Sequence, residues 1–360
     1  MTAAHSIKSS TSSYARPSSH RTKTAKKGIP LTIMFVGMSG LGRSTFINTL
    51  CERMVVQKPP LESPESAHIA EPMQFKTYPI ELEEDQQRIS LTIVDTPGFG
   101  DSLDNEECFQ KILAYIEDQH DEALAEESRI RRNTKFKDGR VHALLYFITP
   151  TGHSLREVDI ELMRRVGHRV NVIPVIGRAD SLTSEELAEF KQRIMKDISY
   201  YKIPTYDFPT ADEEDEDTAE ENAALRRLLP FAVVGCDDVI DEDGRSIRVR
   251  DYPWGRVEVD NIHHNDFDRL RYVLLNSHLH ELRAETLEVH YENYRSEKLS
   301  DDVNDADDAE EDDDNVPVGA TAAAVAAAAA AASSSATAAA LGTNGHSLGS
   351  LAPAVAVGAH

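Results

Sequence analysis

Cysteine is scarce in this chain, which has three cysteines among 360 residues. Because Cys51, Cys108 and Cys236 are widely spaced, the sequence predicts no disulfide framework and a reducing compartment such as the cytoplasm. No secretory signal peptide opens the sequence. A strongly apolar run is also missing, since the alanine-rich stretch near the C-terminus is weakly apolar and interrupted by serines. We therefore expect a cytoplasmic protein without a membrane span.

Positive charge is also in short supply, with 38 Lys and Arg against 62 Asp and Glu and a net charge of −24. This balance argues against a nucleic-acid partner. The excess is concentrated in two blocks, because residues 212–221 carry eight acids and residues 301–314 carry ten. Residues 1–29 carry six basic residues and no acidic one. We expect these charged blocks to form solvated loops or tails outside a folded part.

Composition divides the chain into three parts. Residues 1–29 predict a disordered basic arm, and residues 300–360 a disordered acidic and then alanine-rich tail, because neither part has the apolar content of a packed core. Residues 30–299 are enough for one sizeable folded domain.

Short apolar runs alternate with amphipathic stretches in this domain. The runs predict buried strands at 31–36, 89–94, 142–149, 170–176 and 231–234. The amphipathic stretches predict helices at 44–54, 106–125, 156–167, 184–201 and 266–289. This alternation indicates an α/β fold, with a mostly parallel sheet covered by helices on both faces. Ligands of such sheets bind at the carboxyl ends of the strands.

A phosphate-binding loop follows the first predicted strand. Residues 37–44, GMSGLGRS, match the pattern GxxxxGK[ST] except that Arg43 replaces the lysine. We expect the phosphates of a nucleotide to contact this loop and the start of the next helix, namely Gly37, Ser39, Gly40, Leu41, Gly42, Arg43, Ser44 and Thr45. The alternative is a glycine-rich turn without a ligand. Because arginine is longer and forked, its replacement of lysine puts stabilisation of the γ-phosphate in doubt.

Two further motifs follow later strands. Asp95 begins DTPG at the end of the second run, where an aspartate would hold Mg²⁺ together with Ser44, and Gly98 would meet the γ-phosphate. Asp180 ends GRAD after the fourth run, where its carboxylate would accept both N–H groups of a guanine edge and Arg178 would cover the base. Taken alone, GRAD is also compatible with a charged strand-to-helix turn.

The sequence resembles the septins, a family of filament-forming guanine-nucleotide-binding proteins with a P-loop GTPase-like fold. The resemblance covers about residues 30–298 and is carried by GMSGLGRSTFINTL (37–50), VDTPGFGD (94–101), YFITPTGHSL (146–155), NVIPVIGRAD (171–180), FAVVG (231–235), RVRDYPWG (248–255) and VHYENYR (289–295). The arginine-bearing loop is similar to that of fungal septins found at the ends of septin rods.

The resemblance implies further roles. Arg250 would pack against the guanine base, and the backbone of Gly235 would approach it. His153 would reach across a subunit contact, and residues 230–259 would form the septin unique element, with Trp254 at an interface. On pattern alone, Trp254 is more typical of a core anchor, and His153 of a surface or capping histidine.

The departures from the family concern catalysis. Active septins have a threonine in the first switch, about sixteen residues before the DTPG aspartate, and this count reaches Pro79 here. Thr77, two positions away, is a weak catalytic candidate. Since proline offers neither a hydroxyl nor an N–H group, and Arg43 replaces the P-loop lysine, we predict little or no GTP hydrolysis. The alternatives are an active GTPase switch and a scaffold that binds no nucleotide.

The resemblance also implies partners and a location. Other septins would join this subunit in hetero-oligomeric rods and filaments at the cell cortex, septin ring, bud neck or division septum. The basic residues Arg21, Lys23, Lys26 and Lys27 match a septin segment that binds anionic phosphoinositides, although a solubilising arm or a localisation signal has the same composition. No apolar heptads follow residue 299, so we expect no coiled coil.

Overall fold

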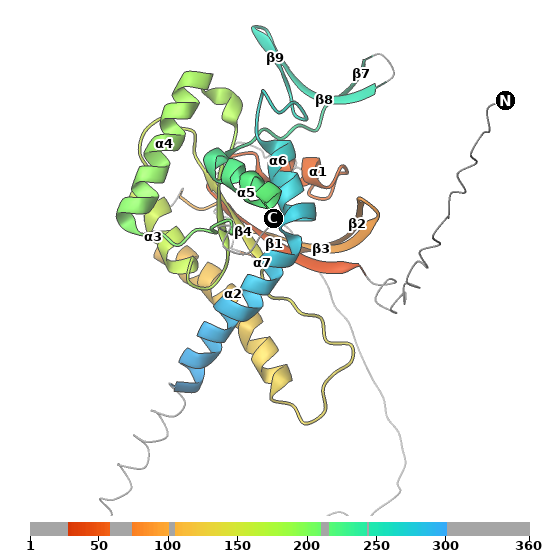
Figure 1. Cartoon of the computed structure of the whole chain (residues 1–360), viewed down its shortest axis with the longest axis vertical. Helices are drawn as coiled ribbons and strands as arrows, with labels where there is room; N and C mark the ends of the chain where they lie inside the picture. The colour runs from red at the N-terminus through yellow and green to blue at the C-terminus, as the bar shows by residue number, and fades with distance from the viewer. Residues whose placement is uncertain (1–27, 58–73, 101–104, 210–215, 243–244, 301–360) are drawn as a thin grey trace, which may run out of the picture. The chain divides into compact units, whose positions relative to one another are not determined.

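A six-stranded sheet forms the centre of the protein (Figure 1). The structure is a computed structural model, which describes residues 28–57, 74–100, 105–209, 216–242 and 245–300. Its strand order is β2-β3-β1-β4-β5-β6. The strands are β1 (Ile29–Gly37), β2 (Lys76–Glu84), β3 (Gln87–Asp95), β4 (Ala143–Ile148), β5 (Val172–Ile176) and β6 (Phe231–Ala232). Only the β2–β3 pair is antiparallel, which confirms the prediction of a mostly parallel sheet.

Both faces of the sheet are buried. On β1, Ile33 and Phe35 point into one hydrophobic cluster, while Met34 and Val36 point into another on the opposite face. All four side chains are inaccessible to solvent. This two-sided burial explains why the strand appears in the sequence as an unbroken apolar run, without the alternation of a half-exposed strand.

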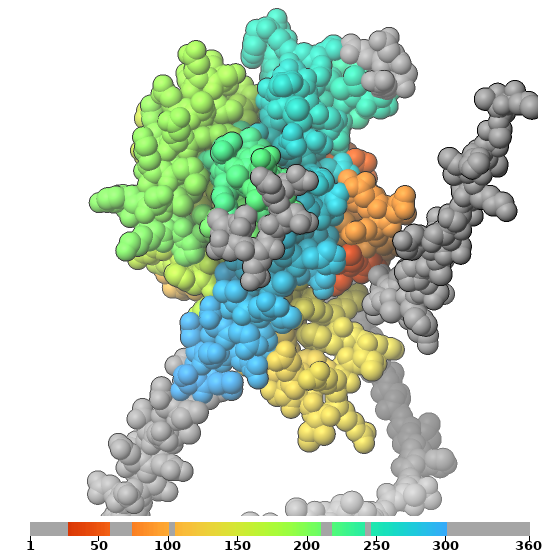
Figure 2. All heavy atoms as spheres, in the orientation of Figure 1, coloured from red at the N-terminus to blue at the C-terminus, as the bar shows by residue number. Residues whose placement is uncertain are grey.

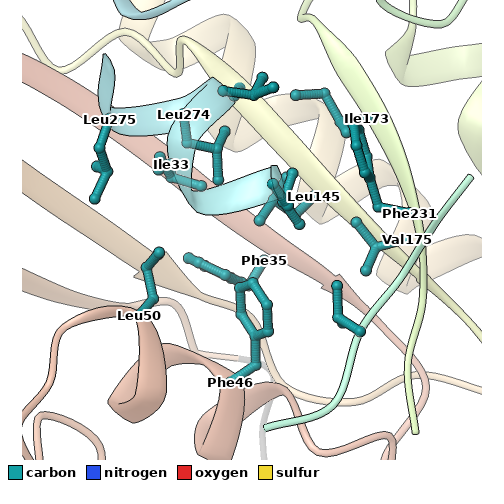
Figure 3. Packing of buried hydrophobic residues seen from close by; sticks show 14 of the residues in the cluster. Ile33, Phe35, Phe46, Leu50, Leu145, Ile173, Val175, Phe231, Leu274 and Leu275 are labelled. Carbon is teal, nitrogen blue, oxygen red and sulfur yellow. The ribbon is translucent and has the colours of Figure 1, made fainter. Parts of the chain in front are cut away.

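One face is covered by α1 (Arg43–Leu50) and by the C-terminal helical segment. In Figure 3, Phe46 and Leu50 of α1 lie with Leu274 and Leu275 against the strand residues of this face. The C-terminal segment comprises α6 (Phe267–Tyr272), a π-helical turn (Val273–Ser277), α7 (Leu279–Glu285) and a second π-helical turn (Thr286–Tyr291). It corresponds to the helix predicted over 266–289.

The opposite face is covered by α2 (Glu106–Glu127), α3 (Glu157–Val166) and α4 (Ser184–Tyr201). The start of α4 is fixed by a capping box, in which the Thr183 hydroxyl accepts the N–H of Glu186 and the Glu186 carboxylate accepts the N–H of Thr183. With helices on both faces, the predicted α/β arrangement is confirmed.

One predicted loop is partly a helix. The acidic block 212–221 was expected to be a solvated loop, but α5 (Glu216–Leu228) begins within it. Acidic residues are favourable in the first turn of a helix because they interact with its dipole, and the Ala, Leu and Arg residues that follow are strong helix formers. The prediction was therefore wrong for residues 216–221, while 212–215 lie outside the described residues, as do 1–27 and 301–360.

A second sheet lies within residues 230–259. It is antiparallel and consists of β7 (Val239–Glu242), β8 (Arg245–Tyr252) and β9 (Gly255–Glu258). Because Tyr252 pairs with Gly255, the β8–β9 turn has only two residues, Pro253 and Trp254. The hairpin projects at the top of the molecule in Figures 1 and 2. Across the residues that the structure describes, no helix combines the length and the apolarity required to span a bilayer.

Three buried histidines make folding sensitive to acid. Burial lowers the pKa values of His120, His142 and His278 to about 4. The Nδ1 atom of His142 accepts the N–H of Thr32 at 2.9 Å, and Nε2 of His278 lies 3.0 Å from Oδ1 of Asn222. These rings are therefore neutral in the folded protein at pH 7.

We expect the protein to lose stability as the pH falls from 6.5 towards 4. In this window the unfolded chain binds protons at histidines that stay neutral in the folded state, which costs about 2 kcal/mol for each buried histidine at pH 5. Urea denaturation at pH 7.5 and 5.0 measures the loss. His278→Gln should reduce it, whereas His263→Gln, at an exposed histidine, should not. An equal loss in both variants would contradict this account.

Candidate functional site

The parallel strands bring the sequence motifs to one edge of the sheet. Residues after β1, β5 and β6 surround a cavity of about 280 Å³ there. Seven residues predicted to bind nucleotide line it: Gly40, Leu41, Gly42, Thr45, Arg178, Gly235 and Arg250. Seven others were not predicted individually: Phe46, Phe147, Gly177, Val233, Cys236, Asp237 and Asp238. A signal for the last three was present, because they continue directly from the quoted string FAVVG.

The phosphate-binding loop has the backbone that its glycines allow. Gly40 and Gly42 adopt φ angles of +77° and +81°, which side chains rarely tolerate. Gly42 is also the N-cap of α1, and no side chain caps this end of the helix. The first N–H groups of α1 therefore remain suited to an anion at the cavity. Gly37 and Ser39 do not line the cavity, since Gly37 ends β1 against Phe147 and Ser39 packs beneath the DTPG segment.

Arg43 points away from the cavity. Its Nη1 atom donates to the carbonyl of Thr96 at 2.7 Å, to the Thr96 hydroxyl at 3.1 Å and to the carbonyl of Phe35 at 3.4 Å. Burial lowers the pKa of the guanidinium, and Asp95 partly offsets this effect. The expectation that Arg43 contacts the nucleotide is not met here, because these three acceptors hold its side chain at the carboxyl ends of β1 and β3.

Asp95 has the environment of a cation ligand. Its buried Oδ1 atom has no hydrogen-bond partner among the described residues. Burial raises the pKa of its carboxyl, while Arg43 and Lys76 oppose the rise. Such an oxygen fits Mg²⁺, and Ser44 is the second residue of α1. Within the described ranges no group of three His, Cys, Asp or Glu residues is arranged to hold a metal, so an ion here would also need oxygens from nucleotide or water.

The DTPG segment packs directly against the phosphate-binding loop. Met38 and Phe99 form a parallel β-bridge, and a Cβ atom on Gly98 would lie 2.6 Å from the Cα atom of Ser39. Only glycine permits this approach. Gly98 is thus beside the loop, as expected, although it does not line the cavity.

The residues considered for catalysis lie on β2. Pro79 pairs with Thr92 inside the edge strand, so counting sixteen residues back from Asp95 does not lead to a position beside the site. Thr77 pairs with Val94, and its hydroxyl forms a hydrogen bond with Tyr115 of α2. The residue opposite Asp95 is Lys76. The argument from Pro79 is therefore withdrawn, and Thr77 is engaged elsewhere.

Asp180 is covered by strand β8. Its side chain is 4% exposed, and Oδ2 lies 3.1 Å from Nη1 of Arg250. The hydroxyl of Tyr252 donates to the same oxygen. Arg178 borders the cavity, where it donates to the carbonyl of Gly40 at 3.4 Å. The structure thus pairs Asp180 with Arg250, both of which were predicted to contact the base, and adds Tyr252, which lies inside the quoted string RVRDYPWG and was missed.

The two predicted interface residues are exposed. Trp254 is 82% exposed, and its ring stacks on Tyr252, with ring centroids 5.2 Å apart and planes inclined by 8°. It is therefore not the core anchor that its pattern alone favoured. His153 is also exposed, and its Nδ1 atom lies 2.8 Å from the carbonyl of Thr151. The four basic residues predicted to bind membrane, Arg21, Lys23, Lys26 and Lys27, lie outside the described residues.

The close contact at Gly98 predicts a steric effect. Gly98→Ala should lower the free energy of unfolding by about 1–3 kcal/mol, because the new methyl group must displace the backbone of Ser39. Gly255→Ala is the matched control, since a Cβ atom there would meet nothing within 4 Å. Chemical denaturation of both variants measures the difference, and equal stabilities would show that the two segments are not in contact.

Known proteins are similar to this chain in sequence and in fold. The family model described as Septin matches residues 27–308. The chain is 52% identical over 280 residues to "Septin homolog spn3" of Schizosaccharomyces pombe, covering 77% of this chain and 75% of the relative. It is 50% identical over 284 residues to "Cell division control protein 11" of Saccharomyces cerevisiae, covering 77% and 68%.

Solved structures agree with this relationship. The crystal structure of Cdc11 from Saccharomyces cerevisiae aligns with a TM-score of 0.51 and 40% identity over 75% of this chain and all of that one. The septin GTPase domain from Chlamydomonas reinhardtii aligns with a TM-score of 0.57 and 26% identity over 75% and 99%. With the family match, the relatives and the solved structures in agreement, this chain belongs to the septin family.

Proposed function

We propose that this septin is a structural subunit that binds a guanine nucleotide but hydrolyses little or no GTP. It assembles with other septins into hetero-oligomeric rods and filaments, which act in cytokinesis and as a scaffold at the cell cortex. The observation that carries the proposal is the orientation of Arg43, which occupies the position of the P-loop lysine yet binds Thr96 outside the cavity.

The cavity suits a guanine nucleotide at both ends. On the phosphate side, the uncapped start of α1 and the backbone of Gly40, Leu41 and Gly42 offer N–H groups. On the base side, Arg178 and Arg250 line the cavity, and Asp180, which pairs with Arg250, would accept two N–H groups of the base. Ser44 and Asp95 would hold Mg²⁺ with the phosphates. A bound Mg²⁺ neutralises phosphate charge.

The same geometry disfavours hydrolysis. Phosphoryl transfer depends on charges that stabilise the phosphate oxygens in the transition state. The guanidinium of Arg43 is buried against three oxygen acceptors, so it supplies no charge at the cavity. Its Nη1 donor instead ties the start of α1 to the DTPG segment through Thr96. The site can thus bind GTP stably without stabilising the transition state of its hydrolysis.

Assembly and location follow from the family and from two exposed residues. Trp254 and His153 present side chains that a neighbouring septin would cover. One relative bears the name Cell division control protein 11, which supports a place at the septin ring, bud neck or division septum. The basic segment that contains Arg21, Lys23, Lys26 and Lys27 would add a reversible contact with anionic phosphoinositides.

Nucleotide content tests this function. We expect the purified full-length protein to release guanine nucleotide when it is denatured, and chromatography to show retained GTP. In a single-turnover assay, the GTP should decay no faster than in an Asp95→Asn control, because neither protein positions the charges for catalysis. Rapid decay to GDP would identify an active switch, and the absence of any nucleotide would identify an empty scaffold. Either result would overturn the proposal.

Replacing Arg43 separates its structural role from phosphate binding. Arg43→Lys should lower the free energy of unfolding by about 1–3 kcal/mol, because a lysine cannot reproduce the hydrogen bonds to Thr96. It should also raise the affinity for GTP relative to GDP, since a free ammonium can reach the phosphates. Denaturation and calorimetric titration measure the two effects. Arg164→Lys, at an exposed arginine on α3, should change neither.

A further inference from the structure

The carboxylate of Asp180 has its donors supplied by the protein itself. Arg250 and Tyr252, both on β8, place a guanidinium nitrogen and a phenolic O–H at the single oxygen Oδ2. A buried carboxylate is costly unless hydrogen-bond donors surround it, and Asp180 is almost wholly buried. The two donors of β8 therefore stabilise Asp180 where it faces the strand.

Tyr252 is held in this position from both sides. Its ring stacks on Trp254, and the guanidinium of Arg250 lies 5.6 Å from its centroid. Burial and the neighbouring Asp180 raise the pKa of Tyr252, so the phenol keeps the proton that it donates. Tyr252 is also the last residue of β8, directly before the turn formed by Pro253 and Trp254.

This arrangement conflicts with base recognition. Asp180 can read guanine only by accepting its ring N–H and its exocyclic amine, yet Asp180 is absent from the cavity lining, where Arg178 and Arg250 are present. We propose that Tyr252 is an internal competitor of the guanine base for Asp180, an inference that rests on the guanine-binding function proposed above. The base, with two donors, displaces the single donor of the phenol.

The exchange reaches the surface of the molecule. When the phenol leaves Asp180, the ring that supports Trp254 moves with it, because only Pro253 separates the two residues. Trp254 is the one tryptophan of the chain and is largely exposed at the hairpin tip. Occupation of the base site is therefore transmitted to the residue expected to meet another subunit.

Calorimetric titration of the full-length protein with GDP, after bound nucleotide is removed, tests the competition. Tyr252→Phe should bind GDP about tenfold more tightly, since the competing hydrogen bond to a charged group is gone. Tyr206→Phe is the matched control, because it removes another phenol that hydrogen-bonds to a carboxylate, Glu281, away from the cavity. Its affinity should equal that of the parent protein. Thermal unfolding verifies that both variants are folded.

Tryptophan fluorescence provides the second measurement. GDP should change the emission of Trp254 in the parent protein, and ADP at the same concentration should not. If the parent binds GDP but Tyr252→Phe binds it no more tightly, or if the emission stays constant, the inference is overturned and the guanine-binding function stands. If neither the parent nor Tyr252→Phe binds GDP, that function fails, and the inference with it. Binding that appears only in Tyr252→Phe supports the competition.

Discussion

Parallel pairing of β1 with both β3 and β4 is the constraint on which the site depends. Ile33 of β1 pairs with Ile93 on one side and with Ala143 on the other, so the chain leaves β1 between two strands that point the same way. The phosphate-binding loop therefore starts where the order of the strands reverses, and the ends of β3 and β5 bring DTPG and GRAD to the same edge. Burial of β1 on both faces fixes this register, because a shift by one residue would exchange its two hydrophobic clusters.

The contact between Arg43 and Thr96 depends on this pairing. Residues 35 and 95 are partners in the β1–β3 register, so the carbonyl of Phe35 and the Thr96 backbone lie close together beside α1. A planar guanidinium can donate to several such oxygens at once, whereas an ammonium is a compact charge that is better suited to mobile phosphates. The burial that lowers the pKa of Arg43 is tolerated because these acceptors surround its charge. An arginine at this position therefore joins two loops that a lysine would leave independent.

The sequence predicted the features that rest on local patterns. Unbroken apolar runs indicated the central strands, and the amphipathic stretch 184–201 indicated α4 with the bounds that the structure has. The motifs also indicated which loops meet. The sequence could not predict features that depend on side-chain direction. The pattern GxxxxGK[ST] places residue 43 in the phosphate-binding loop but does not say whether its side chain enters the cavity. The count to Pro79 failed because separation along the chain does not give strand register, and Tyr252 was missed because its partner Asp180 is 72 residues away.

Arg43 and Tyr252 show the same physical solution at the two ends of the cavity. On the phosphate side, an arginine is satisfied by backbone oxygens, and on the base side a carboxylate is satisfied by a phenol and a guanidinium. A guanine base must replace the phenol at Asp180, so its apparent affinity is reduced in proportion to the fraction of molecules in which this contact is open. The two ends differ in the elements that their contacts join. The Arg43 contacts join elements of the central sheet, whereas Tyr252 belongs to a projecting hairpin with a two-residue turn. In the proposed competition, a guanine base therefore acts on the hairpin and leaves the Arg43 contacts in place.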